Sequence, residues 1–136
     1  MTVNEQEYPD FFPAGCPPID ALTDEKNLFR LCRGLVPSKS DFASYYEGNP
    51  EKYKNNINAY GLSMYQSNED YMEAYRKFPR VRMYSAVAKG ITNNKRGSWK
   101  PTPSKNNPNH ITWWVCKDVN PVDFFEIVDI FGEKDE

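Results

Sequence analysis

The fold class of this chain can be predicted from SNEDYMEAYRKFP, residues 67–79. Ser67 and Asp70 have the spacing of a helix capping pair. Apolar side chains then recur with the periodicity of one helix face, at Tyr71, Met72, Ala74, Tyr75 and Phe78. Pro79 cannot continue a helix. The segment therefore predicts an amphipathic helix over 68–78.

Strand-like segments lie on both sides of this helix, with YGLSMY at 60–65 before it and VRMYSAVA at 81–88 after it. Further strands are predicted at 28–36, 110–116 and 124–131, short helices at 39–47 and 50–57, and a long exposed loop at 92–109. Strands and helices in this order predict an α+β domain, in which two or three short helices pack against a mainly antiparallel sheet.

The length of 136 residues suits one domain, which we expect to span 28–132. Residues 1–27 precede it and contain four prolines, which disfavour helix. Because this segment also holds Tyr8, Phe11 and Phe12, we expect an ordered arm packed on the domain rather than a free tail. Residues 133–136 form an acidic tail. Aromatic residues make up 15% of the chain, so the core should consist largely of rings.

Charge is distributed unevenly along the chain. Ten Lys or Arg residues and no Asp or Glu lie between Ala74 and Lys117, although the net charge is −2. The three tryptophans and the single histidine lie in the same stretch. We expect one basic, Trp-containing face that meets negative charge. The candidate ligand-binding residues are Arg76, Arg80, Arg82, Lys95, Arg96, Trp99, Lys100, Lys105 and Trp113.

The roles of the acidic arm and of the tryptophans each have two interpretations. The arm carries six acidic residues and one lysine, so it either screens the basic face or is simply solvated. Trp113 and Trp114 are neighbours in a strand and should point to opposite faces. An exposed ring could stack on a base or anchor a protein partner. We expect Trp99 in a loop among basic residues, which favours a binding role.

Four residues are candidates for catalysis, each with a plainer alternative. Arg33 near the end of an apolar strand either meets an anion or keeps its head in water at a sheet edge. Ser63 either offers a hydroxyl to a ligand or is an ordinary strand residue. His110 at a loop-to-strand junction suits acid–base or phosphate chemistry, or is structural. Glu126 has a raised pKa if it is buried, or is an edge-strand charge that discourages aggregation.

Two of these elements carry a resemblance to a known family. Leu31-Cys32-Arg33-Gly34-Leu35, and Leu62-Ser63-Met64-Tyr65 followed by the capped helix, resemble the ADP-ribosyltransferase-type fold. The resemblance implies that Arg33 contacts a dinucleotide such as NAD and that Ser63 positions it. The chain departs from the family where an acidic pair is expected, because only the isolated Glu126 is present.

The remaining composition limits the classes of function. Three cysteines without a CxxC pair and one histidine do not predict a zinc site, and we expect no bound metal or cofactor. No leader or membrane-spanning stretch is evident, so we expect a cytoplasmic protein. The sequence favours a small binding or accessory domain for nucleic acid, a nucleotide or an acidic protein surface. The alternatives are an ADP-ribosyltransferase-like enzyme that uses NAD or a nucleotide, and a protein adaptor or inhibitor with no nucleic-acid role.

Overall fold

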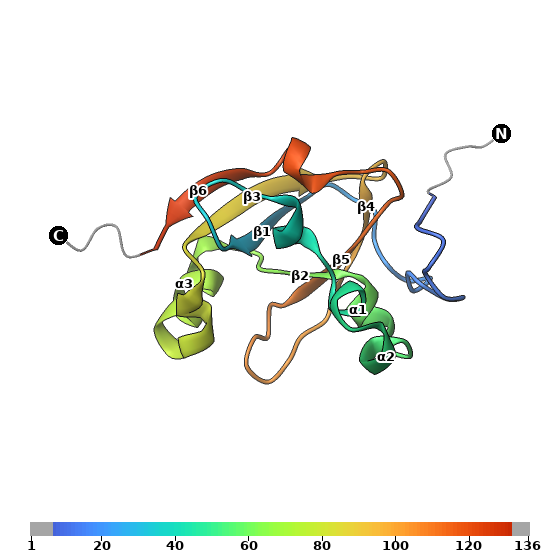
Figure 1. The fold of residues 1–136 in the computed structure, drawn as a ribbon, viewed down its shortest axis with the longest axis horizontal. Helices are drawn as coiled ribbons and strands as arrows, with labels where there is room; N and C mark the ends of the chain where they lie inside the picture. Colours follow the sequence, from blue (N-terminus) through green and yellow to red (C-terminus); the bar gives the residue numbers. More distant parts are fainter. Residues whose placement is uncertain (1–6, 132–136) are drawn as a thin grey trace.

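Two three-stranded antiparallel sheets are the main elements of the computed structural model, which describes residues 7–131 (Figure 1). One sheet has the order β1 (Lys26–Cys32), β3 (Ala86–Thr92) and β6 (Glu126–Ile130). The other has the order β2 (Leu62–Met64), β5 (Ile111–Val115) and β4 (Gly97–Pro101). Phe29 and Tyr65 connect the sheets through two backbone hydrogen bonds of 3.1 and 2.9 Å. The predicted α+β class is confirmed, with the strands divided between two sheets.

The helices are short. The predicted helix at 68–78 is present as α3 (Asn68–Lys77), and the Ser67 hydroxyl accepts a hydrogen bond from the Asp70 backbone N–H. The segment predicted as one helix at 39–47 is instead a 3-10 turn, η1 (Lys39–Phe42), followed by α1 (Tyr45–Gly48). Ser44 separates the two, because its side chain caps the new helix in a reciprocal pair with Glu47. The second predicted helix is α2 (Pro50–Tyr53).

Two predicted elements were wrong. The segment predicted as a strand at 81–88 begins as the 3-10 helix η3 (Pro79–Met83), because Pro79 fits the first turn of such a helix, and β3 starts only at Ala86. The segment predicted as a loop at 92–109 contains β4, in which Trp99 is buried. β4 packs closely on β5, since a Cβ on Gly97 would lie 2.2 Å from the Trp114 carbonyl oxygen.

Both sheets contribute side chains to one apolar core, and rings fill much of it. Trp113 is fully buried, and its ring centroid lies 5.6 Å from that of Phe125. Phe125 also packs on Phe42 of η1, at 5.0 Å between centroids. The core cluster comprises Leu28, Cys32, Phe42, Leu62, Met64, Ala88, Trp99, Ile111, Trp113 and Phe125.

The described part of the arm packs on the side of the molecule that carries β4 (Figure 1). Leu22 and Trp99 exchange backbone hydrogen bonds of 2.7 and 2.8 Å, so the arm covers the outer edge of β4. The arm packs on the domain, as predicted, over residues 7–25, whereas Lys26 and Asn27 already belong to β1. The predictions for residues 1–6 and for the tail at 133–136 fall outside the described residues.

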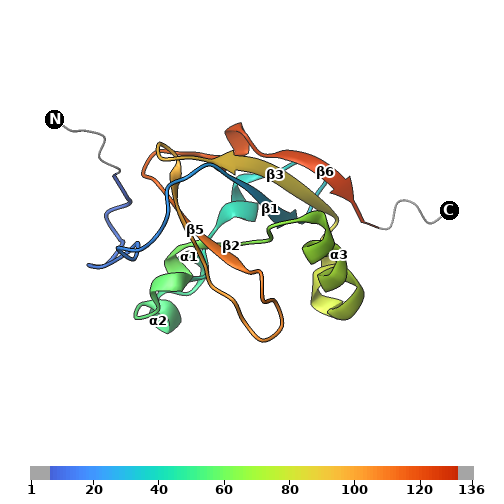
Figure 2. The ribbon, with the colours of Figure 1, turned by 180° about the vertical axis from the view of Figure 1, so that it is seen from behind.

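Helices α1, α2 and α3 and the long β4–β5 loop lie together on one side of the β1–β3–β6 sheet (Figure 1). In both views the loop extends between α3 on one side and α1 and α2 on the other (Figure 1, Figure 2). None of the helices between residues 7 and 131 has the length and apolarity needed to cross a bilayer.

Candidate anion-binding cleft

A cleft of about 930 Å³ lies where the two sheets, the helices and the β4–β5 loop meet. Segments far apart in sequence line it: the end of β1, residues 40–45, residues 53–65, α3, residues 78–84 and the 102–112 region. Its volume is within the range of small-molecule sites in proteins.

Arg30 forms part of the inner wall of this cleft. Alternation along β1 places it on the same face as Leu28 and Cys32, which are fully buried. Its Nε donates to the Asp41 carbonyl oxygen at 2.8 Å, and its Nη1 donates to the Ser63 carbonyl oxygen at 2.8 Å. Nη2 donates to the carbonyl oxygen of Ala43 at 3.4 Å. These three bonds fix the guanidinium in the wall of the cleft.

Carbonyl oxygens, rather than carboxylates, are the hydrogen-bond partners of the Arg30 side chain. Burial lowers the pKa of Arg30 from its ordinary value, but an arginine remains protonated in proteins. Within residues 7–131, Arg30 forms no ion pair. The guanidinium also carries more N–H groups than these three bonds use. The cleft therefore contains a fixed positive charge with donors to spare.

Two further arginines line the same cleft. The Arg33 guanidinium lies 5.0 Å from the centre of the Tyr84 ring. Arg80, from η3, is close enough to Tyr65 for its charge to oppose the rise in the pKa of Tyr65 that burial causes. In the described part of the chain, neither Arg33 nor Arg80 forms an ion pair.

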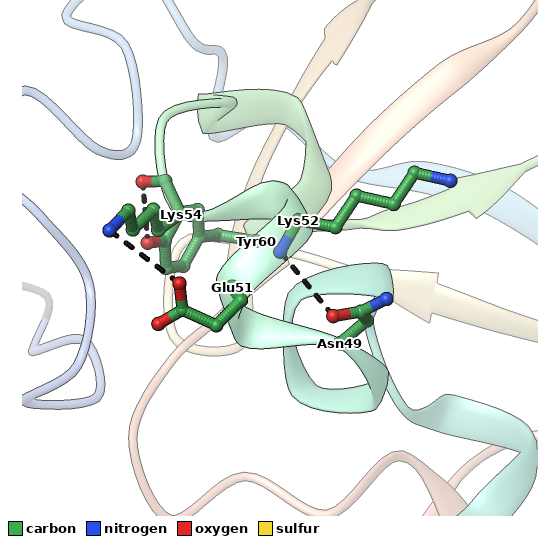
Figure 3. A network of polar contacts seen from close by, with 5 residues as sticks. All are labelled: Asn49, Glu51, Lys52, Lys54 and Tyr60. Carbon is green, nitrogen blue, oxygen red and sulfur yellow. Dashed lines mark hydrogen bonds and ion pairs between the residues drawn. The ribbon is translucent and has the colours of Figure 1, made fainter.

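Tyrosine rings form much of the remaining wall. Tyr45 and Tyr53 lie 5.6 Å apart between ring centroids, and Tyr45 is 60% exposed. Contacts around α2 hold the helix that carries Tyr53: Asn49 accepts from the Lys52 backbone N–H, and the Tyr60 hydroxyl donates to the Lys54 carbonyl oxygen (Figure 3). An exposed ring at the edge of a cleft that contains arginines is suited to stacking on a planar group.

Ser63 and His110, two of the predicted catalytic residues, line the cleft. Leu62 and Met64 are buried on one face of β2, so Ser63 lies on the opposite face, paired in register with Thr112. The Thr112 and Thr102 hydroxyl oxygens are 2.8 Å apart, and Thr102 Oγ1 is 2.8 Å from His110 Nδ1.

The environment of His110 favours the neutral imidazole. Burial lowers the pKa of His110 most strongly, and the positive charge of Arg30 lowers it further. A hydrogen bond with the Thr102 backbone acts in the opposite direction. A neutral imidazole can both donate and accept a hydrogen bond, so His110 can contact either kind of ligand atom.

The structure contradicts the stacking role predicted for Trp113 and the loop position predicted for Trp99. Trp113 has no exposed surface, and its indole N–H donates to the Thr92 hydroxyl at 2.8 Å, so it cannot stack on a ligand. Trp99 lies in β4 rather than a loop, is 9% exposed, and donates to the Asp24 carbonyl oxygen. Both rings belong to the core because β4 and β5 pair through them.

Glu126 does not line the cleft with the other predicted catalytic residues. It is the exposed first residue of β6, which pairs only with β3 among the described strands. The prediction that Glu126 is buried is therefore wrong. The alternative, a charge on an edge strand that discourages aggregation, fits the geometry.

The basic residues of 74–117 do not gather around the cleft. Arg82 donates to the Tyr75 and Arg76 carbonyl oxygens, and thereby ties η3 to α3. Arg96 stacks on Phe124, with 3.8 Å between the guanidinium and the ring centre. Among the nine predicted ligand-binding residues only Arg80 lines the cleft; those outside it are Arg76, Arg82, Lys95, Arg96, Trp99, Lys100, Lys105 and Trp113.

Arg30 and the tyrosines line the cleft although the sequence patterns did not predict them as site residues. Arg30 has a signal in the sequence, because it alternates with Leu28 and Cys32 and so shares their face of the strand. The tyrosines at 45, 65 and 84 have none, since ring-rich composition does not distinguish a core tyrosine from one in a cleft.

Metal binding has no support in the described part of the cleft. Between residues 7 and 131, no three His, Cys, Asp or Glu side chains are grouped so that they could hold a metal ion. Comparison of the chain with protein-family models, with curated proteins and with solved structures gives no match. The function proposed below therefore rests on the geometry of the cleft.

Proposed function

We propose that this chain is a binding domain for a small phosphate-bearing ligand of the nucleotide class, held in the cleft. The observation that carries the proposal is Arg30, a half-buried cation whose guanidinium donates to carbonyl oxygens rather than to a carboxylate. Arg33 and Arg80 line the same cleft without ion pairs in the described residues. An arginine held in place before binding loses little freedom when it meets a phosphate.

The neighbouring groups suit the rest of a nucleotide. Tyr45 and Tyr53 offer a ring surface for a base, and His110, Ser63 and several asparagines offer donors and acceptors for a sugar. Tyrosine thus takes the stacking role that the sequence assigned to tryptophan.

The proposal is tested by calorimetric titration with ATP, NAD, ADP-ribose and pyrophosphate, with adenosine as the ligand that lacks phosphate. We expect the phosphate-bearing ligands to bind and adenosine to bind far more weakly. Arg33→Gln and Arg80→Gln should each weaken binding about tenfold to a hundredfold, because a charge-assisted hydrogen bond contributes about 1.5–3 kcal/mol.

Arg76→Gln and Lys95→Gln are the matched controls, since both residues are exposed and lie outside the lining of the cleft. They should leave affinity within about twofold. Equal affinity for adenosine and ATP, or equal losses in the control and cleft variants, would exclude the proposal. If a single-stranded oligonucleotide binds more tightly than any nucleotide, the ligand class is nucleic acid rather than a small nucleotide.

An enzyme of ADP-ribosyltransferase type is the second candidate. It is favoured by one observation: Arg33, just after β1, and Ser63, in β2 before α3, line the same cleft as His110. Glu126 would have no part in it, whereas Asp70 and Glu73 of α3 are cleft carboxylates. Incubation with NAD and chromatography of released nicotinamide tests this candidate. Release that persists unchanged in Arg33→Ala and Ser63→Ala would rule out these roles.

A further inference from the structure

Three large apolar side chains are exposed at the cleft or close to it in sequence. Leu35 is 59% exposed, Val36 74% and Met83 64%. Leu35 and Val36 follow Arg33 in the loop after β1, and Met83 ends η3. A cluster of exposed apolar side chains on a rigid surface is a common mark of a protein-binding site.

The loop that presents Leu35 and Val36 is held at both ends by one carboxylate. The buried Asp41 side chain accepts hydrogen bonds from the Arg33 backbone N–H at 3.1 Å and from the Ser38 backbone N–H at 2.9 Å. The exposure of Leu35 and Val36 is therefore built into a fixed loop, so binding there would cost little ordering of the backbone.

The loop and η3 are neighbours in space. The Ser85 backbone N–H donates to the Cys32 carbonyl oxygen at 3.0 Å, and the Arg33 guanidinium lies over the Tyr84 ring. These contacts bring the residue after Met83 against the residues before Leu35. We call the surface formed by Arg33, Leu35, Val36, Arg80 and Met83 the docking surface.

Positive charge prevails on these two segments. Residues 28–41 contain Arg30, Arg33 and Lys39 against one acidic residue, the buried Asp41, and residues 79–84 contain Arg80 and Arg82 and no acidic residue. Charge complementarity therefore selects an acidic partner. Aliphatic side chains contribute nothing to phosphate contacts, so their presence beside the arginines favours an acidic protein segment over nucleic acid.

We propose that the docking surface binds a protein segment that carries apolar anchors flanked by Asp or Glu. The anchors contact Leu35, Val36 and Met83, and the carboxylates contact Arg33 and Arg80. This proposal does not depend on the function proposed for the cleft, although Arg33, Arg80 and Met83 belong to both surfaces.

The test is selection of a random peptide library on the wild-type protein without nucleotide, followed by affinity measurement of the enriched peptides. We expect enriched peptides with one or two apolar anchors and a net negative charge. The triple variant Leu35→Ser/Val36→Ser/Met83→Ser should weaken their binding at least about tenfold. The substituted side chains are exposed, and thermal unfolding verifies that the variant is folded.

The control is Ile19→Ser/Val128→Ser, which removes exposed apolar side chains elsewhere, at 103% and 50% exposure. It should leave peptide affinity unchanged. The proposal is overturned if nothing is enriched, if the enriched peptides are basic or lack an apolar anchor, or if the triple variant binds them as wild type does. Preferential binding of single-stranded DNA at this surface also overturns it. If the wild-type protein binds the enriched peptides but no nucleotide, only the function proposed for the cleft is refuted.

Discussion

Two groups of cations in this protein have different partners. On the side covered by the arm, Lys100 pairs with Asp20 at 3.0 Å and Lys117 pairs with Asp10 at 3.7 Å. In the cleft, Arg30 is bound by carbonyl oxygens, and Arg33 lies against a tyrosine ring.

The difference shows that a count of basic residues does not locate an anion site. The acid-free stretch from 74 to 117 obtains carboxylates from the acidic arm, so part of its charge is neutralised in the fold. Arg30 and Arg33 lie outside that stretch, yet they line the cleft. What matters is which partner the fold supplies to each cation.

The largest effect should come from a residue that the sequence assigned to ligand binding. Trp113→Ala removes a fully buried ring and its hydrogen bond to Thr92, so the free energy of unfolding should fall by about 3–5 kcal/mol. Urea denaturation measures this. Tyr45→Ala is the control, because Tyr45 is exposed. A loss below about 1 kcal/mol for Trp113→Ala would show that the ring is not part of the core.

Arg30→Met should affect both stability and ligand binding. The Ser63 and Asp41 carbonyl oxygens would lose a charged donor, which should lower the free energy of unfolding by about 1.5–3 kcal/mol. Nucleotide binding should become undetectable. Arg30→Lys keeps the charge and should restore part of the affinity. Full binding by a folded Arg30→Met protein would contradict the role of this cation.

His110 should make stability depend on pH. Its pKa is lowered in the folded state, so as pH falls below about 6.5 the unfolded chain takes up the proton first and stability decreases. The loss ends once the pH passes below the folded pKa. The slope cannot exceed about 1.4 kcal/mol per pH unit for one proton. Urea denaturation from about pH 7.5 to about pH 5.5 should show that the free energy of unfolding changes less steeply with pH in His110→Gln than in the wild type. Equal slopes would show that His110 does not cause the pH dependence.

The smallest effect is expected at the neutralised cations. Asp20→Asn breaks the ion pair with Lys100. Because the Asp20 side chain is 64% exposed and the Lys100 side chain 34% exposed, the free energy of unfolding should fall by only about 0.2–1 kcal/mol. Added salt should reduce the difference from wild type. Nucleotide affinity should not change. A change in affinity as large as that of Arg33→Gln would erase the distinction between the two groups of cations.

Elements with a strong local pattern could be predicted from the sequence. α3 has a cap, an apolar face and a terminating proline within one segment, and β5 is a short apolar run. β4 could not be recognised, because it forms through pairing with distant partners, Leu22 on one edge and β5 on the other. The start of β3 was misplaced, because the alternating residues before it are used in η3 instead.

The site was predictable in part for the same reason. Three predicted residues line the cleft: Arg33, Ser63 and His110. Each lies at the end of a strand or within a short one, where a polar residue can be recognised from the apolar residues beside it. That Trp99 and Trp113 are core residues depends on which strands pair, and that Glu126 lies elsewhere depends on sheet order. Neither pairing nor sheet order can be deduced from the residues around these positions.

The contact between Leu22 and Trp99 has a practical consequence. The proline-rich beginning of the chain resembles a segment that could be trimmed, yet the backbone of Leu22 caps the outer edge of β4. A protein shortened to begin after residue 25 would leave that edge with unpaired N–H and C=O groups. Such an edge can form β-pairs with another molecule. Such a fragment should form soluble aggregates on size exclusion, whereas an affinity tag placed ahead of the intact arm should be tolerated.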